Sequence, residues 1–488
     1  MKKLSLLILL LVSFSGLAQV NKYNIENFSN LCKAWGVYKY FSQETNIGNI
    51  DADSLLILSL QANKTEVGFD WDAILNVFLN DHLTIKSINN SNPQDYIDSI
   101  YNSLGFSISF KNFYANQIKK LLKNRHDSLY YMSYLVPQGS SLPKNERSYS
   151  ENKYPSFEQR LITVFRYWNW VFYFFPYKHL IDEDWNEVLN ESLLSVGNAT
   201  NSLDYQLNCR AMINRIDDSH SWSGTDLFFE EYAKSQVPFL FTVINDKLII
   251  RRVLGDFYCS EDRIPERGDE ILEINYLSFT NIKDFYLKYA PGSNSESKLR
   301  NAGAYFKWTQ TDTVQIKYIS EKDTIQSFIA TYNNEKLNEV YQKIMPYDSL
   351  FKINKDLIYV DLEKWPRSKI PTLVNKIYNS KGIILDLRTY PEWSMYDLLR
   401  YLPHDTTTPT FRFWEPVPNV PGRFQLITVE TIPQRKDSLY TGDIITLVNS
   451  FTQSRCEFYT MAMQICDNNT TIGSTTSGAD GDISCIIL

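Results

Sequence analysis

The part of this sequence that most restricts its fold is a buried strand followed at once by a polar turn and a helix. The apolar run at 444–448 predicts the strand, the turn ends at Ser454, and a helical pattern begins directly after that serine. A serine in such a turn presents its hydroxyl at the mouth of a cleft, beside helix N–H groups that could stabilise an oxyanion. Ser454 is therefore the candidate nucleophile. The alternative is that Ser454 or Thr452 only caps the helix, which is a far more frequent role.

The rest of the C-terminal third alternates between strands and helices. Such alternation predicts a largely parallel sheet in an α/β core, which we place at 326–488. Functional residues of these sheets gather at the carboxyl ends of the strands, and both Arg388 and Ser454 follow such ends. The expected strands are 357–361, 382–388, 424–429, 443–448 and 470–472, and the expected helices are 370–378, 393–402 and the segment after Ser454.

The length and the first residues indicate an exported protein of several domains. A chain of 488 residues is too long for one hydrophobic core. Residues 1–18 have the basic start, short apolar run and small residues of a secretory signal peptide. Gln19 follows the expected cut, and because it is not a cysteine we expect no bacterial lipid anchor. The mature protein would be periplasmic or extracellular, with no transmembrane segment.

Charge and cysteine spacing exclude several classes of partner. The net charge of −7 becomes more negative once Lys2 and Lys3 are removed, and the lysines form no basic stripe for nucleic acid. The six cysteines have no spacing typical of a metal site, and buried free thiols are the default for a chain of this size. We therefore expect no nucleic acid, no metal and no cofactor.

The region before residue 237 is predicted to be helical and to contain an internal repeat. The aromatic run 35–41 matches 168–174, and the segment 70–79 matches 184–193 in the same order. We predict one copy at 19–135, a linker at 136–156 that is rich in small and polar residues, and a second copy at 157–236. Aromatic stripes of this kind are assigned to the core, and Asp70 and Asp184 to helix starts.

Residues 237–325 are predicted to form a small β-rich module. Two apolar runs on either side of Asn245 and Asp246 are typical of a hairpin. The Gly-Asp-Glu-Ile-Leu-Glu-Ile-Asn segment at 268–275 resembles the corresponding segment of PDZ domains, which bind a peptide as an added strand. The alternative is a β-module that acts only as a spacer.

A serine nucleophile needs a base, and the chain has five histidines. The neighbours of His82 and His126 indicate surface positions, His179 lies at a helix end, and His404 lies in a loop after a helix. The remaining histidine, His220, has aspartates and serines around it that could fix its tautomer.

Three segments together resemble the C-terminal-processing and tricorn-core serine peptidases. They are Gly-Ile-Ile-Leu-Asp-Leu-Arg at 382–388, Leu-Val-Asn-x₄-Ser-x-x-Glu at 447–457, and Ile-Gly-x-Thr-x-x-Gly-x-x-Gly at 472–481. The resemblance implies that Ser454 is the nucleophile, and that the backbone N–H of Arg455 is one oxyanion donor. A second donor would follow Arg388.

The resemblance favours the tricorn-like branch. The processing branch uses a lysine base, and Ala479 stands at that position here. The tricorn-like branch uses a histidine preceded by a serine, which the pair Ser219–His220 matches. The family's glycine-rich turn is replaced by 389–393, where Pro391 has no N–H, so the second donor is assigned to Tyr390. That branch also has an orienting glutamate further along, and we expect a chain ending at Leu488 to be a shortened member.

These observations predict an exported serine endopeptidase in which Ser454 attacks the peptide bond and His220 takes its proton, with Ser219 holding the imidazole. Its substrate would be a peptide or an unfolded protein engaged by the PDZ-like module, with a free C-terminus as one candidate point of contact. A catalytically impaired peptide-binding protein of the same descent is the alternative. A carbohydrate-acting enzyme that uses Asp480 and Asp482 is the third and weakest hypothesis.

Overall fold

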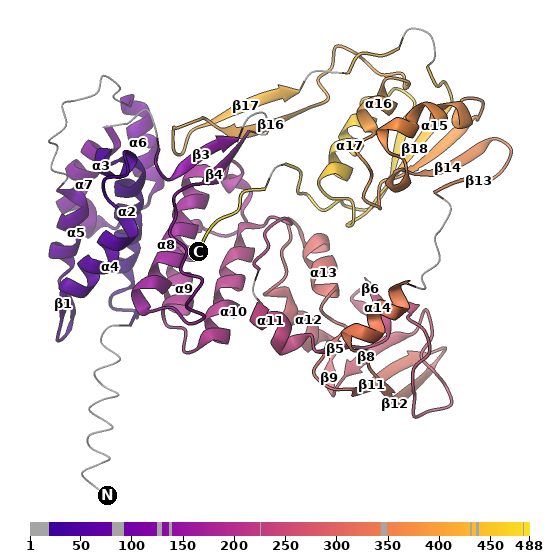
Figure 1. The fold of residues 1–488 in the computed structure, drawn as a ribbon, viewed down its shortest axis with the longest axis horizontal. Coiled ribbons are helices and arrows are strands. Elements are labelled where there is room, and N and C mark those ends of the chain that lie inside the picture. Colours follow the sequence, from indigo (N-terminus) through magenta and orange to yellow (C-terminus); the bar gives the residue numbers. More distant parts are fainter. Residues whose placement is uncertain are drawn as a thin grey trace, which may run out of the picture. The chain divides into compact units, whose positions relative to one another are not determined.

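The computed structural model describes residues 19–80, 92–123, 129–135, 139–224, 226–342, 349–429, 432–435, 439–481 and 483–488. The chain forms two compact units (Figure 1). The first comprises Met1–Met212, Trp414–Leu426 and Asp482–Leu488, and the second comprises Ile213–Phe413 and Ile427–Gly481. The predicted signal peptide and residues 136–138 of the predicted linker lie outside the described residues. The finer domain boundaries stay predictions.

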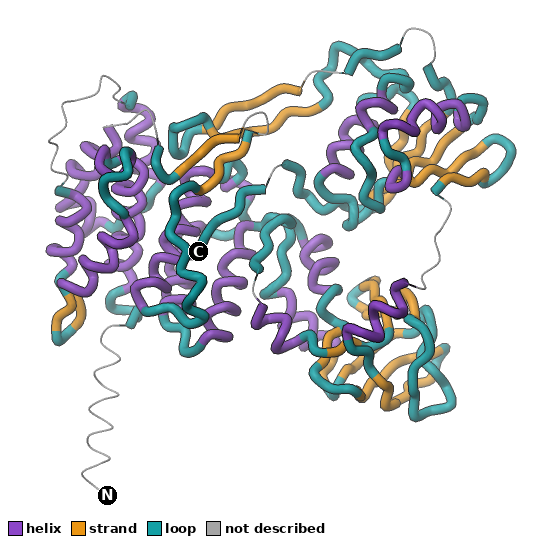
Figure 2. Tube along the Cα trace, in the orientation of Figure 1, coloured by secondary structure: helices purple, strands orange, loops and turns teal. Residues whose placement is uncertain are grey.

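Helices make up most of the first unit (Figure 2). Two short hairpins, β1–β2 and β3–β4, accompany them. The helices are α2 (Ile25–Phe41), α3 (Gln43–Asn46), α4 (Ala52–Ala62), α5 (Trp71–Leu79), α6 (Gln94–Ser103), α7 (Ile108–Lys123), α8 (Phe157–Phe174), α9 (Trp185–Gly197) and α10 (Ser202–Ile213). The hairpin strands are β1 (Lys64–Thr65), β2 (Gly68–Phe69), β3 (Met132–Leu135) and β4 (Ser140–Pro143).

The aromatic stripes of this unit lie in its core. Trp35 and Trp168 are buried, and each indole N–H donates to a backbone carbonyl at the start of a neighbouring helix. Asp70 and Asp184 cap α5 and α9, accepting hydrogen bonds from backbone N–H groups of the first turn. These contacts explain why tryptophan and aspartate are needed at these positions. A common origin of the two segments remains a prediction.

The second unit begins with a sheet in the order β12-β11-β8-β7-β6, with β9 paired to β8. Asn245 and Asp246 form the turn of its first hairpin, with φ of 50° and 59°, which matches the right-handed twist of the strands. The strands are β6 (Phe239–Ile244), β7 (Lys247–Val253), β8 (Glu270–Ile274), β9 (Leu277–Ser278), β11 (Thr313–Ser320) and β12 (Asp323–Ala330). Around them lie α11 (Asp226–Tyr232), α12 (Phe279–Leu287), α13 (Ser295–Gly303), α14 (Asn334–Gln342) and the pair β5 (Ser235–Gln236) and β10 (Trp308–Thr309).

A second sheet carries the candidate nucleophile. Its order is β13-β14-β15-β18-β19, in which β14, β15, β18 and β19 are parallel and β13 is an antiparallel edge. Alternate strand residues such as Ile358, Leu385 and Ile444 share one buried core with the helices that lie beside the sheet in Figure 1. The elements are β13 (Leu350–Lys352), β14 (Leu357–Asp361), α15 (Ile370–Ile377), β15 (Gly382–Asp386), α16 (Met395–Leu399), β18 (Asp443–Val448), α17 (Arg455–Gln464) and β19 (Asn469–Gly473).

One predicted strand of this sheet lies elsewhere. Strand β17 (Phe424–Val429) pairs with β16 (Phe411–Pro416) in a separate two-stranded sheet. The short connection between them favours a local hairpin over a crossover to the parallel sheet. The hairpin tip contacts helices of the first unit, because Gly422 N–H donates to the Tyr173 carbonyl at 2.7 Å. The prediction of a strand was correct in position, but its assignment to the α/β layer was wrong.

The chain is thus a multidomain protein of mixed helix and sheet. None of the helices in the described residues is long and apolar enough to span a bilayer. The six cysteines are all free thiols, and four of them, Cys32, Cys209, Cys456 and Cys466, are buried.

Candidate active site

Ser454 occupies a strained position between β18 and α17. Its φ of 56° and ψ of −122° place a non-glycine residue in a region that L-residues rarely adopt. The turn before it is fixed by Thr452, which is fully buried and whose hydroxyl donates to the Leu387 carbonyl at 2.9 Å. The same hydroxyl accepts the Asn449 N–H at 3.0 Å. A sharp strand-to-helix turn of this kind holds a serine hydroxyl out at the carboxyl edge of the sheet.

Glu457 keeps that turn in place. The residue is 8% exposed, and its carboxylate accepts the Ser454 N–H at 3.1 Å. It also accepts the Thr476 hydroxyl at 2.7 Å and the N–H groups of Gly478 and Ala479 at 2.6 and 2.9 Å. One buried carboxylate therefore ties the nucleophile's backbone to the loop that follows β19. The sequence indicated Glu457 only as part of a motif and not as the centre of this network.

Gln453 brings the Ser219–His220 segment to the same turn. Its amide donates to the Ser219 carbonyl at 3.4 Å, and its Oε1 accepts the Ser477 hydroxyl at 3.0 Å. Ser219 is buried, and its hydroxyl donates to the Ser477 carbonyl at 2.9 Å. The predicted serine–histidine pair thus lies against the residue that precedes Ser454, although the two segments are far apart in the sequence.

The imidazole of His220 lies beside an aspartate. Its Nδ1 is 3.6 Å from Asp218 Oδ1, and the same oxygen accepts the His220 N–H at 2.8 Å. The His220 side chain is 16% exposed, so the ring is accessible to a reactant. Among the described hydrogen bonds there is none between this imidazole and the Ser454 hydroxyl. Catalytic hydrogen bonds often form only when substrate is bound. The role of His220 as the base for Ser454 therefore stays a prediction.

Two backbone N–H groups, one next to Ser454 in the chain and one in the loop that packs on α17, have no acceptor among the described residues. Arg455 is the first residue of α17, so its N–H has no partner within the helix. The N–H of Tyr390 is likewise without an acceptor in the described structure. The loop that contains Tyr390 packs on α17, because the Cys456 thiol donates to the Thr389 carbonyl at 3.3 Å and the Tyr459 hydroxyl to the Glu392 carbonyl at 2.7 Å.

Arg300 from α13 was not found by sequence reasoning. Its guanidinium donates to the Ser450 carbonyl at 2.5 Å and to Gln453 Oε1 at 2.6 Å. Burial lowers the pKa of Arg300, and the charge of Glu457 opposes that shift. No local pattern in the sequence around Arg300 or Gln453 indicates these contacts, which depend on the tertiary fold.

The other four histidines and Asp482 either lie away from Ser454 or fall outside the described residues. His404 is buried with both ring nitrogens against backbone carbonyls, of Leu402 at 2.9 Å and Ile432 at 2.8 Å, which is a structural role. His179 is exposed. His82, His126 and Asp482 lie outside the described residues.

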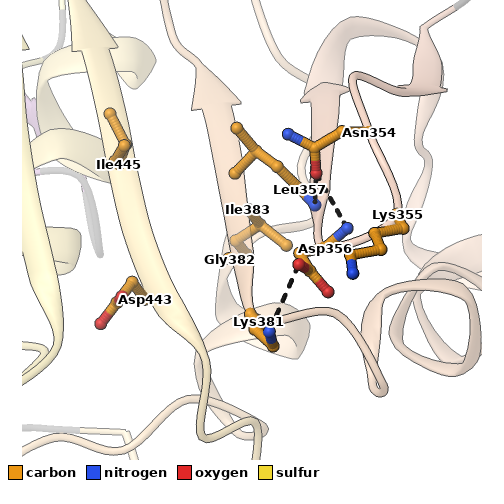
Figure 3. A pocket seen from close by; sticks show the side chains of 9 residues that line it. All are labelled: Asn354, Lys355, Asp356, Leu357, Lys381, Gly382, Ile383, Asp443 and Ile445. Atoms are coloured by element: carbon orange, nitrogen blue, oxygen red, sulfur yellow. Dashed lines mark hydrogen bonds and ion pairs between the residues drawn. The ribbon is translucent and has the colours of Figure 1, made fainter.

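A pocket of 420 Å³ opens at the other end of the parallel sheet (Figure 3). It is lined by the first residues of three strands, Leu357, Gly382 and Asp443, and by the neighbouring lysines Lys355 and Lys381. Ser454 follows the carboxyl end of β18, whereas this pocket lies at its amino end. The pocket is therefore not part of the candidate active site.

No protein-family model matches the sequence, and no curated protein matches it significantly. The structure is similar to mature CPAF complexed with lactacystin, at 10% identity and a TM-score of 0.48, over 67% of this chain and 86% of that one. It is similar to the photosystem II D1 C-terminal processing protease at 12% identity and a TM-score of 0.34, over 66% of this chain and 82% of that one. Similarity to the tricorn protease, at 12% identity and a TM-score of 0.26, covers 74% of this chain and 36% of that one.

The chain resembles the C-terminal-processing and tricorn-like serine peptidases. The solved structures thus come from the family that the motifs around Ser454 indicated. At these identities and TM-scores the likeness assigns no role to any residue. The roles of individual residues must therefore rest on the geometry of the site.

Proposed function

We propose that the protein is an exported serine endopeptidase that hydrolyses bonds in peptides or unfolded proteins. The observation that supports this most is the strained Ser454, held at the carboxyl edge of the sheet beside the unpartnered N–H of Arg455. A nucleophile must be accessible to its substrate, and Ser454 is partly exposed. A tetrahedral intermediate needs a hydrogen-bond donor beside it. Glu457 and Ser454 also form a capping box, but a serine that only caps a helix is ordinarily extended and does not require the positive φ of Ser454.

In the proposed reaction the Ser454 oxygen attacks the peptide carbonyl carbon, and His220 accepts the hydroxyl proton. The intermediate's oxygen lies between the N–H groups of Arg455 and Tyr390. His220 then gives the proton to the departing amine, and water releases the acyl group by the reverse sequence. Ser219 acts indirectly, since its hydroxyl anchors the histidine segment to the Ser477 carbonyl.

The test is hydrolysis of unstructured peptides by purified protein, together with labelling by a fluorophosphonate probe. Ser454→Ala is expected to abolish both, and His220→Gln to reduce turnover by at least about 100-fold, in the range of lost general-base catalysis. Ser450→Ala, in the same turn, is the matched control and should retain activity. Turnover that survives in the Ser454→Ala protein would reject the assignment.

A peptide-binding role is the second candidate, and an edge strand supports it. Strand β6 pairs only with β7 among the described strands, which leaves its outer edge available to an extended peptide. The opposite edge is covered, because the Ser260 N–H donates to the Phe328 carbonyl of β12 at 2.9 Å. Under this hypothesis the module at 237–325 is PDZ-like and binds peptide, with or without cleavage at Ser454.

Binding of a fluorescent peptide, measured by anisotropy, separates the two roles. Saturable binding with no cleavage of the peptide over a day would favour the binding protein and contradict the endopeptidase. The proposal of export is tested separately, by fractionation of cells that produce the full chain and by sequencing the mature N-terminus. A mature protein that begins with Met1 would contradict cleavage after Ala18.

A further inference from the structure

The side chain of Arg455 lies across the loop of residues 389–393. Its guanidinium carbon is 3.7 Å from the centroid of the Trp393 ring and 5.0 Å from that of Tyr390. Its Nη1 donates to the Pro391 carbonyl at 2.9 Å. One side chain at the first residue of α17 thus contacts three residues of the loop.

These contacts hold side chains that are otherwise open to solvent. Tyr390 is 52% exposed and Trp393 is 58% exposed, whereas the Nε of Arg455 is inaccessible to solvent and has no acceptor among the described residues. A planar guanidinium on an aromatic face is attracted by the ring quadrupole, most strongly by an indole. Burial of an unpaired Nε is unfavourable, so the stacked arrangement must be maintained by the contacts on its faces and at Nη1.

The loop needs such support because its sequence is unusual for an oxyanion turn. It contains no glycine, and Pro391 has no N–H, so the donor is assigned to Tyr390. An oxyanion donor is effective only when its N–H points at the developing charge before the reaction begins. Displacement of about 1 Å is enough to lower a rate strongly.

We propose that the Arg455 side chain is a positioning residue that holds the 389–393 loop, so that the Tyr390 N–H completes an oxyanion hole with the backbone N–H of Arg455 itself. This inference rests on the proposed function for the catalytic role of the hole. The side chain touches neither the substrate nor the reacting atoms, and it acts through the loop. Its own backbone donor is retained in any variant other than proline.

The experiment compares Arg455→Ala, Arg455→Lys and the wild-type chain in peptide hydrolysis and in hydrogen exchange of residues 387–394. For the alanine variant we expect kcat to fall by about 10-fold to 100-fold, less than for loss of a whole donor, with KM within about 3-fold. The Arg455→Lys variant should have a higher kcat than the alanine variant but a lower one than the wild type. Its ammonium group can donate to the Pro391 carbonyl, but it is not planar and cannot stack on the aromatic rings. Exchange in the loop should become faster in the alanine variant. Arg412→Ala, at an exposed strand position, is the control and should change neither quantity.

An unchanged kcat in the alanine variant would overturn the inference, as would a fall in kcat with unchanged exchange in the loop. A rise in KM alone would assign the side chain to substrate binding and also overturn it. If the alanine variant fails to fold by circular dichroism, the lysine variant decides by the same two readings. If the wild-type chain hydrolyses no peptide, the proposed function fails, and the exchange comparison alone decides whether Arg455 orders the loop.

Discussion

Replacing Glu457 by glutamine should loosen the turn that holds the candidate nucleophile. The carboxylate accepts four hydrogen bonds, two at each oxygen, from Ser454, Thr476, Gly478 and Ala479. A glutamine amide offers one oxygen, so two of the four acceptor interactions are lost and an N–H₂ group faces other N–H donors. A hydrogen bond to a charged group contributes about 1.5–3 kcal/mol, so we expect a loss of about 3 kcal/mol or more in the free energy of unfolding.

The assay is thermal unfolding of the full chain, combined with hydrogen exchange of residues 469–481. For a domain of this size, 3 kcal/mol corresponds to a fall in melting temperature of about 6–12 °C. Labelling of Ser454 by the fluorophosphonate probe should fall as well, because the turn no longer holds the strained φ. Glu335→Gln, on the exposed face of α14, is the matched control. If both variants melt within about 2 °C of the wild type, the carboxylate does not stabilise the turn and the reasoning is refuted.

Three further substitutions test other parts of the second unit by the same melting assay. His404→Ala removes the N–H donor to at least one of the two backbone carbonyls that face its ring nitrogens and should cost about 1–3 kcal/mol, and no change would contradict the structural role. Burial opposes ionisation of Asp386, but hydrogen bonds from Arg388 and other donors lower the pKa of this carboxyl. The resulting stabilisation is fully present at pH values above the unfolded-state pKa of about 3.9, and it is lost as the pH falls through the lower pKa of the folded state. Asp386→Asn should therefore destabilise the protein at pH 6 and do so progressively less below pH 4. Gly473→Ala would place a Cβ 1.8 Å from the Val448 carbonyl oxygen and should cost about 3 kcal/mol, whereas a near-neutral change would mean that β18 can shift.

Local patterns predicted most of the elements of the second unit. The hairpin at Asn245, the strands β14, β15, β18 and β19, and the start of α17 after Ser454 lie where the apolar periodicity and turn residues indicated. Such signals depend on neighbours within a few residues. The same reasoning failed for β17, because strand propensity does not say with which strand a segment will pair.

In the candidate site, too, local sequence patterns did not predict contacts between distant segments. Ser454 could be selected from the sequence because a strand, a turn and a helix follow each other within one short segment. From the sequence, a glutamate three residues into a helix is predicted only to cap that helix. In the structure, the four hydrogen bonds of Glu457 instead join two segments of the chain. Arg300 and Gln453 carried no local signal at all.

The sequence by itself determined that a serine stands at the carboxyl end of a buried parallel strand, since periodicity and turn chemistry act over neighbouring residues. Only the tertiary structure decided that Ser219, Gln453 and Ser477 meet, and that Arg455 stacks on a loop more than sixty residues earlier. The reason is physical. Contacts between distant segments follow from the packing of whole sheets and helices, and no short stretch of chain contains that information.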